Sequence, residues 1–192
     1  MSAPGMFVEL DEFTAADREA LRDLNVREQA RTESVLQEAP EGTYTVGYEK
    51  REMFTFHEPS LGTIRFDVRS IKDSILAGRI PAVVYRVNAV PREFYEHVKA
   101  NNGVEPERLP KINGRDLERL GIMVNWGENQ TLIDGNHRMV RRCDLGMPSF
   151  RFLLVPVTHC IPHMCRPGDE ERLFHRDRPG VQLLHSELRE EP

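Results

Sequence analysis

The spacing of apolar and polar positions along the chain predicts short strands interspersed with helices. Segments rich in β-branched and aromatic residues, separated by turn residues, predict strands over 43–48, 53–57, 63–68, 82–87 and 149–157. Two further segments of this kind, 122–125 and 131–133, flank a short polar connection and predict a hairpin. The chain is therefore expected to contain a sheet in which some neighbouring strands are antiparallel.

Helices are predicted where a capping or terminating residue borders an apolar stripe. Their ranges are 70–77 before Gly78, 92–100 after Pro91, 115–120, and 136–145 before Gly146. Near the start, Thr14 as N-cap with Asp17 at the third helical position predicts a further helix, with Phe13 placed as a hydrophobic staple. This helix is expected to run to about Gln37 and to lie on the surface as an accessory element, because charged residues dominate its middle.

Hairpins mixed with helices favour an α+β fold with a mixed sheet and flanking helices over a doubly wound sheet. A chain of 192 residues fits one domain with elaborated ends. The expected division is an N-terminal helical extension over 1–42, a central domain over 43–160, and a polar C-terminal tail over 161–192 with one short helix near 169–174.

The composition limits the kinds of partner and the cellular location expected for this domain. The chain is 39% apolar and 30% charged with a net charge of −5, so no overall basic excess indicates a nucleic-acid binder. It has no apolar run long enough to span a membrane and no signal-peptide pattern at its start. Its three cysteines do not form the framework of a disulfide-rich domain. We therefore expect a cytoplasmic protein without membrane association.

The segment 131–138 is the most informative part of the sequence, because an apolar strand runs through Gly135 directly into a helix. Unpaired N–H groups at a helix start bind phosphate well, and Gly135 and Asn136 lie at this start. Arg138 offers a planar fork to phosphate oxygens, and His137 is able to donate a hydrogen bond or move a proton. Asp134 is placed to bind Mg²⁺. Taken singly, each residue also suits a cap or surface role, but their combination favours a phosphate site.

The sequence LIDGNHRMVRRCDLG, followed by the strand FRFLLVPV, resembles the DG-x-HR strand, turn and helix of the ParB/sulfiredoxin-like superfamily. The resemblance covers about 120–157, with looser support over 67–87. It implies a ParB/sulfiredoxin-like mixed sheet and a turn that holds nucleotide phosphates. Asn136 stands where sulfiredoxin-like members have cysteine, and the Glu-Arg-Arg run and helix-turn-helix domain of partition proteins are missing. The nearest members are kinases that phosphorylate free serine.

This resemblance implies a phosphotransferase that uses ATP, ADP or another nucleotide with Mg²⁺ and acts on a small hydroxylated acceptor or a nucleotide. A carboxylate should orient or deprotonate the acceptor hydroxyl, and Asp67 and Glu58, near predicted strand ends, are the candidates beside Asp134. The alternatives are a nucleotide-sensing DNA-binding module and a nuclease. Arg141 and Arg142, next to the motif, supply local positive charge for nucleic acid in those cases.

A second group of chemically active residues follows the last strand. His159, Cys160, His163 and Cys165 are all able to ligate a metal such as zinc. A tetrahedral site takes a second pair of ligands from elsewhere, and no matching short-spaced pair exists in the chain. A turn with packed cysteines is therefore the preferred interpretation.

Overall fold

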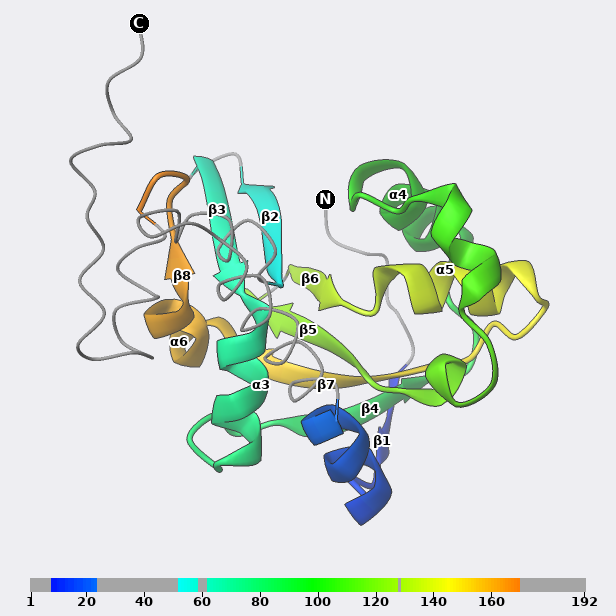
Figure 1. Cartoon of the computed structure of the whole chain (residues 1–192), viewed down its shortest axis with the longest axis horizontal. Helices are drawn as coiled ribbons and strands as arrows, with labels where there is room; N and C mark the ends of the chain where they lie inside the picture. The colour runs from blue at the N-terminus through cyan, green and yellow to red at the C-terminus, as the bar shows by residue number, and fades with distance from the viewer. Residues whose placement is uncertain (1–7, 24–51, 59–61, 128, 170–192) are drawn as a thin grey trace, which may run out of the picture.

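The computed structural model describes residues 8–23, 52–58, 62–127 and 129–169 (Figure 1). The larger sheet has five strands in the order β1-β4-β7-β5-β6. Their bounds are β1 Val8–Asp11, β4 Val83–Val87, β5 Gly121–Asn125, β6 Gln130–Asp134 and β7 Phe150–Pro156. The β5–β7 pair is parallel, whereas the β1–β4, β4–β7 and β5–β6 pairs are antiparallel, so the sheet is mixed.

A smaller sheet and several helices cover the two faces of the larger one. The smaller sheet has the order β2-β3-β8, with β2 Met53–Glu58, β3 Gly62–Asp67 and β8 Met164–Cys165. The α-helices are α3 Val68–Leu76, α4 Arg92–Asn101, α5 Asn136–Asp144 and α6 Val157–Cys160, and residues 15–23 are also helical. The 3₁₀ helices are η1 Pro106–Lys111, η2 Gly114–Glu118 and η3 Ile161–His163. The fold is therefore α+β, as expected.

The strand alternation of β7 divides the core in two. Leu153 and Val155 pack with apolar residues of α3 and β3, whereas Phe150 and Phe152 pack with apolar residues of α4 and α5. Figure 1 shows α3 with the β2–β3 hairpin and the α4–α5 pair as separate groups around the large sheet. Both groups contribute walls to the site described below.

Most elements predicted from apolar spacing are confirmed within one or two residues, including the β5–β6 hairpin and α5. The helix predicted over 115–120 is the 3₁₀ helix η2 at Gly114–Glu118, and the preceding predicted loop contains η1. Pro106 and Pro110 lack the N–H groups that a longer α-helix needs, so short tight turns result. Three predicted elements lie outside the described residues. They are the strand over 43–48, the helix beyond residue 23, and the helix near 169–174 apart from Asp169.

Both segments that flank the predicted central domain contribute strands. Residues 8–11 form β1, which pairs along its whole length with β4, although the sequence pattern did not predict this strand. At the other end, Met164 and Cys165 form β8 and pair with Phe66 and Arg65 of β3. The sheets therefore extend beyond the segment that carries the strongest apolar signals. None of the helices within the described residues has the length and apolar character needed to cross a membrane.

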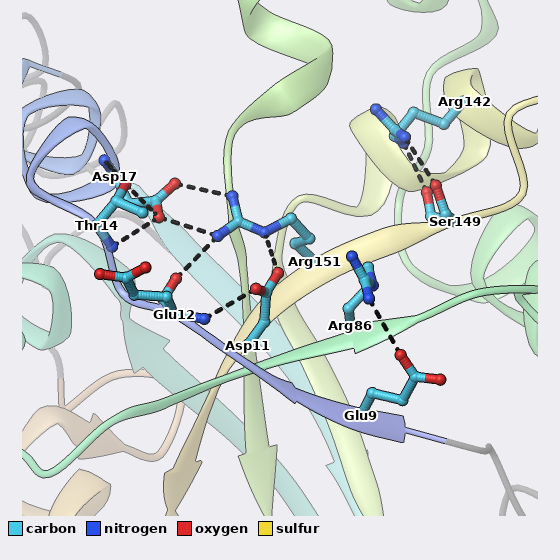
Figure 2. Close-up of polar contacts among 9 residues, drawn as sticks. All are labelled: Glu9, Asp11, Glu12, Thr14, Asp17, Arg86, Arg142, Ser149 and Arg151. Atoms are coloured by element: carbon cyan, nitrogen blue, oxygen red, sulfur yellow. Dashed lines mark hydrogen bonds and ion pairs between the residues drawn. The ribbon is translucent and has the colours of Figure 1, made fainter.

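Arg151 of β7 anchors the N-terminal segment to the sheet (Figure 2). Its Nε donates to Asp11 at 2.7 Å, and its two terminal nitrogens each donate to an oxygen of Asp17 at 3.0 Å. Asp17 also completes the predicted capping box, because it accepts from the Thr14 N–H at 3.0 Å while Thr14 Oγ1 accepts from the Asp17 N–H at 3.1 Å. One guanidinium thus fixes both β1 and the start of the first helix.

We predict that Arg151→Met lowers the free energy of unfolding by about 1.5–3 kcal/mol, because it removes hydrogen bonds to two carboxylates. The matched control is Arg86→Met, since Arg86 pairs with Glu9 in an exposed contact across β1 and β4. This control should change stability by less than about 0.5 kcal/mol. Urea unfolding of both variants measures the difference, and equal losses would contradict the anchoring role.

The same anchor predicts a pH dependence. Burial raises the pKa of Asp17, but hydrogen bonds from Arg151 and Thr14 outweigh it and hold the pKa below the usual 3.8. A lowered carboxyl pKa stabilises the folded state above the ordinary value, and the stabilisation is lost as the pH falls through the lowered value. The stability difference between the natural protein and Arg151→Met should therefore shrink when unfolding is measured below pH 3.8.

Candidate functional site

The turn between β6 and α5 has the strand, glycine and helix arrangement that the sequence predicts. Gly135 has φ +92° and occupies the N-cap of α5, and no side chain caps this helix start. A Cβ atom on Gly135 would lie 3.0 Å from Gly121 Cα and 3.1 Å from both the Phe150 ring and Arg138. Only glycine therefore suits this position, and the first N–H groups of α5 are left for another acceptor.

This turn forms one wall of a cavity of about 750 Å³. A second wall comes from residues 52–55 at the start of β2, and a third from the connection 101–119 between α4 and β5. The predicted residues Asp134, Gly135, Asn136, His137 and Arg138 all line the cavity, so the structure brings this group together. Ligand pockets commonly measure roughly 300–1,000 Å³, which makes this cavity large enough for a nucleotide.

A chain of alternating charges connects two walls of the cavity. Lys72 Nζ lies 2.6 Å from Glu52 Oε2 and 3.2 Å from Asp134 Oδ2, and Arg138 Nη2 lies 3.1 Å from the same Asp134 oxygen. The Lys72 side chain is 2% exposed and that of Asp134 9%. Each buried charge thus has at least one opposite neighbour, which offsets part of the cost of removing it from water.

Glu52, Lys72 and Asp134 have displaced pKa values. Burial raises the pKa of Asp134, but Arg138 and Lys72 outweigh it and hold the value well below the usual range. Burial lowers the pKa of Lys72, yet Asp134 and Glu52 more than offset this effect and raise it. The pKa of Glu52 is raised by burial and then by Asp134, and Lys72 offsets this only in part. Glu52 is therefore the carboxylate in this group that accepts a proton most readily.

His137 is held in one protonation state by its neighbours. Its Nε2 accepts a hydrogen bond from the Glu105 N–H at 3.0 Å, so the neutral ring carries its proton on Nδ1. Burial and then the positive charge of Arg108 lower its pKa, which keeps the ring neutral at pH 7. Next to it, Asn136 accepts from the Asn102 side chain at 2.9 Å and so ties α5 to the end of α4. His137 is thus a neutral hydrogen-bond donor on the cavity wall.

Three arginines among the described residues line the cavity, and they differ in how far their guanidinium groups are already bound to other protein groups. Arg138 Nη2 donates to the Leu120 carbonyl at 2.9 Å as well as to Asp134, whereas its buried Nε has no partner among the described residues. Arg119 lies 3.2 Å from Asp116. Arg108 lies 3.5 Å from Glu105 in an exposed contact, and it is the arginine that a ligand recruits most easily.

Arg142, which was expected with Arg141 to supply local positive charge, is instead bound to carbonyl groups of the protein. It is buried and donates to the Ser149 carbonyl at 2.7 Å and to the Leu117 carbonyl at 3.1 Å. Its bond to the Ser149 side chain is drawn in Figure 2. These contacts give Arg142 a role in packing α5 against the chain rather than in an exposed basic surface.

The two carboxylates predicted to serve the acceptor have different positions: Asp67 adjoins the lining residue Val68, whereas Glu58 lies at the far end of β2. Asp67 is buried at the N-cap of α3, where it accepts from the Ser70 N–H at 3.1 Å. Glu58 ends β2, while the opposite end of this six-residue strand reaches the cavity. Neither residue is among those described as lining the cavity. The carboxylate on this wall is Glu52, whose carbonyl accepts from the Val68 N–H at 3.0 Å.

Sequence reasoning missed Glu52 and Lys72 for different reasons. Glu52 lies in the polar run Glu-Lys-Arg-Glu, where nothing distinguishes it from a surface residue. Lys72, however, shares a helical face with the buried residues Val68, Ile71 and Ile75. A lysine on the apolar stripe of a helix indicates a buried partner, so this signal was present in the sequence.

The described residues contain no group of three or more His, Cys, Asp or Glu side chains placed to hold a metal ion. Asp134 Oδ2 is already shared by two cations, so its predicted role as a Mg²⁺ ligand would need its other oxygen or phosphate oxygens from a substrate.

The four residues considered for zinc have separate surroundings. Cys160 is buried in the core, which raises its pKa to about 12, and His163 lies 2.8 Å from Ser70 and 3.2 Å from Ser74. His159 is exposed, and Cys165 belongs to β8. Such surroundings agree with the preferred interpretation of a structural turn.

Comparisons of the chain with protein-family models, with curated proteins and with solved structures found no match. The resemblance to the ParB/sulfiredoxin-like superfamily therefore rests on the DG-x-HR segment and its surroundings, and it stays a prediction.

We predict that Gly135→Ala destabilises the protein more than Gly146→Ala does, by about 1–3 kcal/mol. Both glycines have positive φ, at +92° and +73°, so both substitutions carry backbone strain. A Cβ atom at Gly135 also meets Gly121 and Phe150, whereas nothing lies within 4 Å of one at Gly146. Thermal and urea unfolding compare the variants, and equal losses would show that the close approach at Gly135 is unimportant.

Proposed function

We propose that this chain is a nucleotide-dependent phosphotransferase of the ParB/sulfiredoxin-like kind, which transfers a phosphoryl group from ATP or a related nucleotide to the hydroxyl of a small acceptor. The observation that carries the proposal is a single cavity with phosphate-binding groups on one wall and the Glu52 carboxylate on another. Phosphoryl transfer requires this separation, because the donor phosphate and the acceptor oxygen approach from opposite sides.

The β6–α5 turn is the proposed phosphate wall. The uncapped start of α5 presents backbone N–H groups and the positive end of the helix dipole. Neutral His137 adds a donor, and Arg108 adds a mobile positive charge. Arg138 stays paired with Asp134 and stabilises the turn itself. Its buried Nε has no hydrogen-bond partner among the described residues, so it is able to donate to a ligand. These groups match the charge and geometry of phosphate oxygens.

Glu52 is the proposed base for the acceptor. Burial raises its pKa above that of an ordinary glutamate and so makes it a stronger base, and 32% of its side chain remains exposed. In the proposed step the acceptor oxygen bonds to the terminal phosphorus of the nucleotide, and the bond from that phosphorus to its bridging oxygen breaks. The bridging oxygen keeps the electron pair, and the hydroxyl proton passes to Glu52.

The first prediction of this proposal concerns binding. ATP should raise the thermal unfolding midpoint, because a ligand that binds the folded state stabilises it. Arg108→Ala should weaken ATP binding by about tenfold through loss of one charged phosphate contact, whereas Arg92→Ala should leave it unchanged. Arg92 is the matched control because it is an exposed arginine that pairs with Glu96 and is not among the cavity-lining residues. No midpoint shift with ATP, ADP, CTP or GTP, with or without Mg²⁺, would refute the nucleotide site.

The second prediction separates an enzyme from a nucleotide-sensing module. Glu52→Gln keeps the shape of the wall but removes the base, so it should bind ATP with affinity close to that of the natural protein. Transfer from ATP to an active hydroxylated acceptor, found by screening small-molecule pools for ADP release, should fall at least about 100-fold. Nucleotide binding without any acceptor-dependent ADP release would favour the sensing module, and metal-dependent cleavage of DNA would favour the nuclease.

A further inference from the structure

Lys72 is a deeply buried charged group beside the cavity. The residue is 1% exposed and is not among the described residues that line the cavity, yet its ammonium contacts the Glu52 and Asp134 carboxylates, which do. These carboxylates belong to different parts of the chain. Glu52 precedes β2 and Asp134 ends β6, and Lys72 itself lies on α3. One buried nitrogen thus connects three segments at the base of the site.

If only the stability of the fold mattered, a lysine at this position would carry a cost in desolvation free energy. Ile71 and Ile75 on the apolar face of α3 pack into a core that includes Phe66 of β3, where a leucine or methionine in place of Lys72 would fill similar space without desolvating a charge. Replacing a buried ion pair with apolar groups is often neutral or stabilising. The arrangement therefore favours a role for the charge beyond stability.

We infer that Lys72 is a positioning residue that holds the Glu52 carboxylate on the acceptor side of the cavity and links it to Asp134 on the phosphate side. The inference rests on the proposed function, because it assigns Lys72 to the service of the proposed base. Lys72 does not reach the cavity and touches no reacting atom, so it acts only through the two carboxylates.

The charges that face Glu52 determine what the loss of Lys72 would do. Lys72 on α3 and Arg138 on α5 favour the ionised carboxylate, whereas burial and Asp134 on β6 oppose it. Without Lys72, Glu52 keeps the repulsion of Asp134 and loses its closest positive charge. Glu52 should then bind its proton up to a higher pH, and the protein should need a higher pH to provide an ionised base.

The experiment measures the titration of Glu52 directly by carbon-13 NMR of the glutamate carboxyl groups, with its signal assigned by its loss in Glu52→Gln. In Lys72→Met this signal should titrate about one pH unit or more above its position in the natural protein. Lys72→Arg keeps the positive charge and should stay close to the natural protein. An unchanged titration in Lys72→Met would overturn the inference.

A second measurement covers the case in which Lys72→Met does not fold. The ammonium signal of Lys72 in the natural protein, assigned by its loss in Lys72→Arg, should be protected from hydrogen exchange, and this protection should fall in Glu52→Gln. Unchanged protection there would equally overturn the inference. Acceptor-dependent ADP release from ATP is measured in parallel. If the Glu52 titration depends on Lys72 but no transfer is found, the proposed function fails, whereas transfer with a Glu52 titration independent of Lys72 rejects only the positioning role.

Discussion

The close approach of Gly121 and Gly135 is the constraint on which the site depends. A Cβ on Gly121 would lie 2.8 Å from the Phe150 ring and 2.9 Å from the Asp134 carbonyl, and one on Gly135 would lie 3.0 Å from Gly121. The starts of β5, α5 and β7 and the end of β6 therefore meet at a point where neither Gly121 nor Gly135 has space for a side chain. This contact turns the start of α5 toward the cavity and fixes the depth at which Asp134 lies. The side-chain contributions to the site therefore depend on this backbone geometry.

The charge chain from Glu52 to Arg138 is the second level of organisation. Alternation of sign makes it tolerable in a buried position, and the four charges balance one another. Its members come from four different segments. The four charges therefore also fix the position of the β2 wall relative to the β6–α5 wall. A site built across such distant segments forms only when both sheets are in place, so its assembly follows the fold rather than any local propensity.

The sequence predicts the local parts of this site and not its non-local ones. The strand, Gly135 and helix were readable because each signal lies within a few residues of the next, and the capping box of Thr14 and Asp17 was readable for the same reason. The partner of Asp134 was not readable, since Lys72 is distant in sequence and is brought close only by the packing of α3. Asp67 had the right chemistry near a strand end, but the adjacent helix uses it as a cap. The order of strands, with β7 between β4 and β5, had no local signal either.

The distribution of charge also determines which ligand suits the cavity. Within the described residues, the positive groups on or directly behind its walls are Arg108, Arg119, Arg138 and Lys72, and they exceed the negative groups Glu52, Asp116 and Asp134 by one charge while His137 is neutral. Most of this positive charge is already paired within the protein. A nucleotide di- or triphosphate carries more negative charge than the exposed Arg108 and a helix start offset. A cation bound to the phosphates is therefore the expected companion of such a ligand, and its oxygen ligands would come mainly from the nucleotide rather than from Asp134.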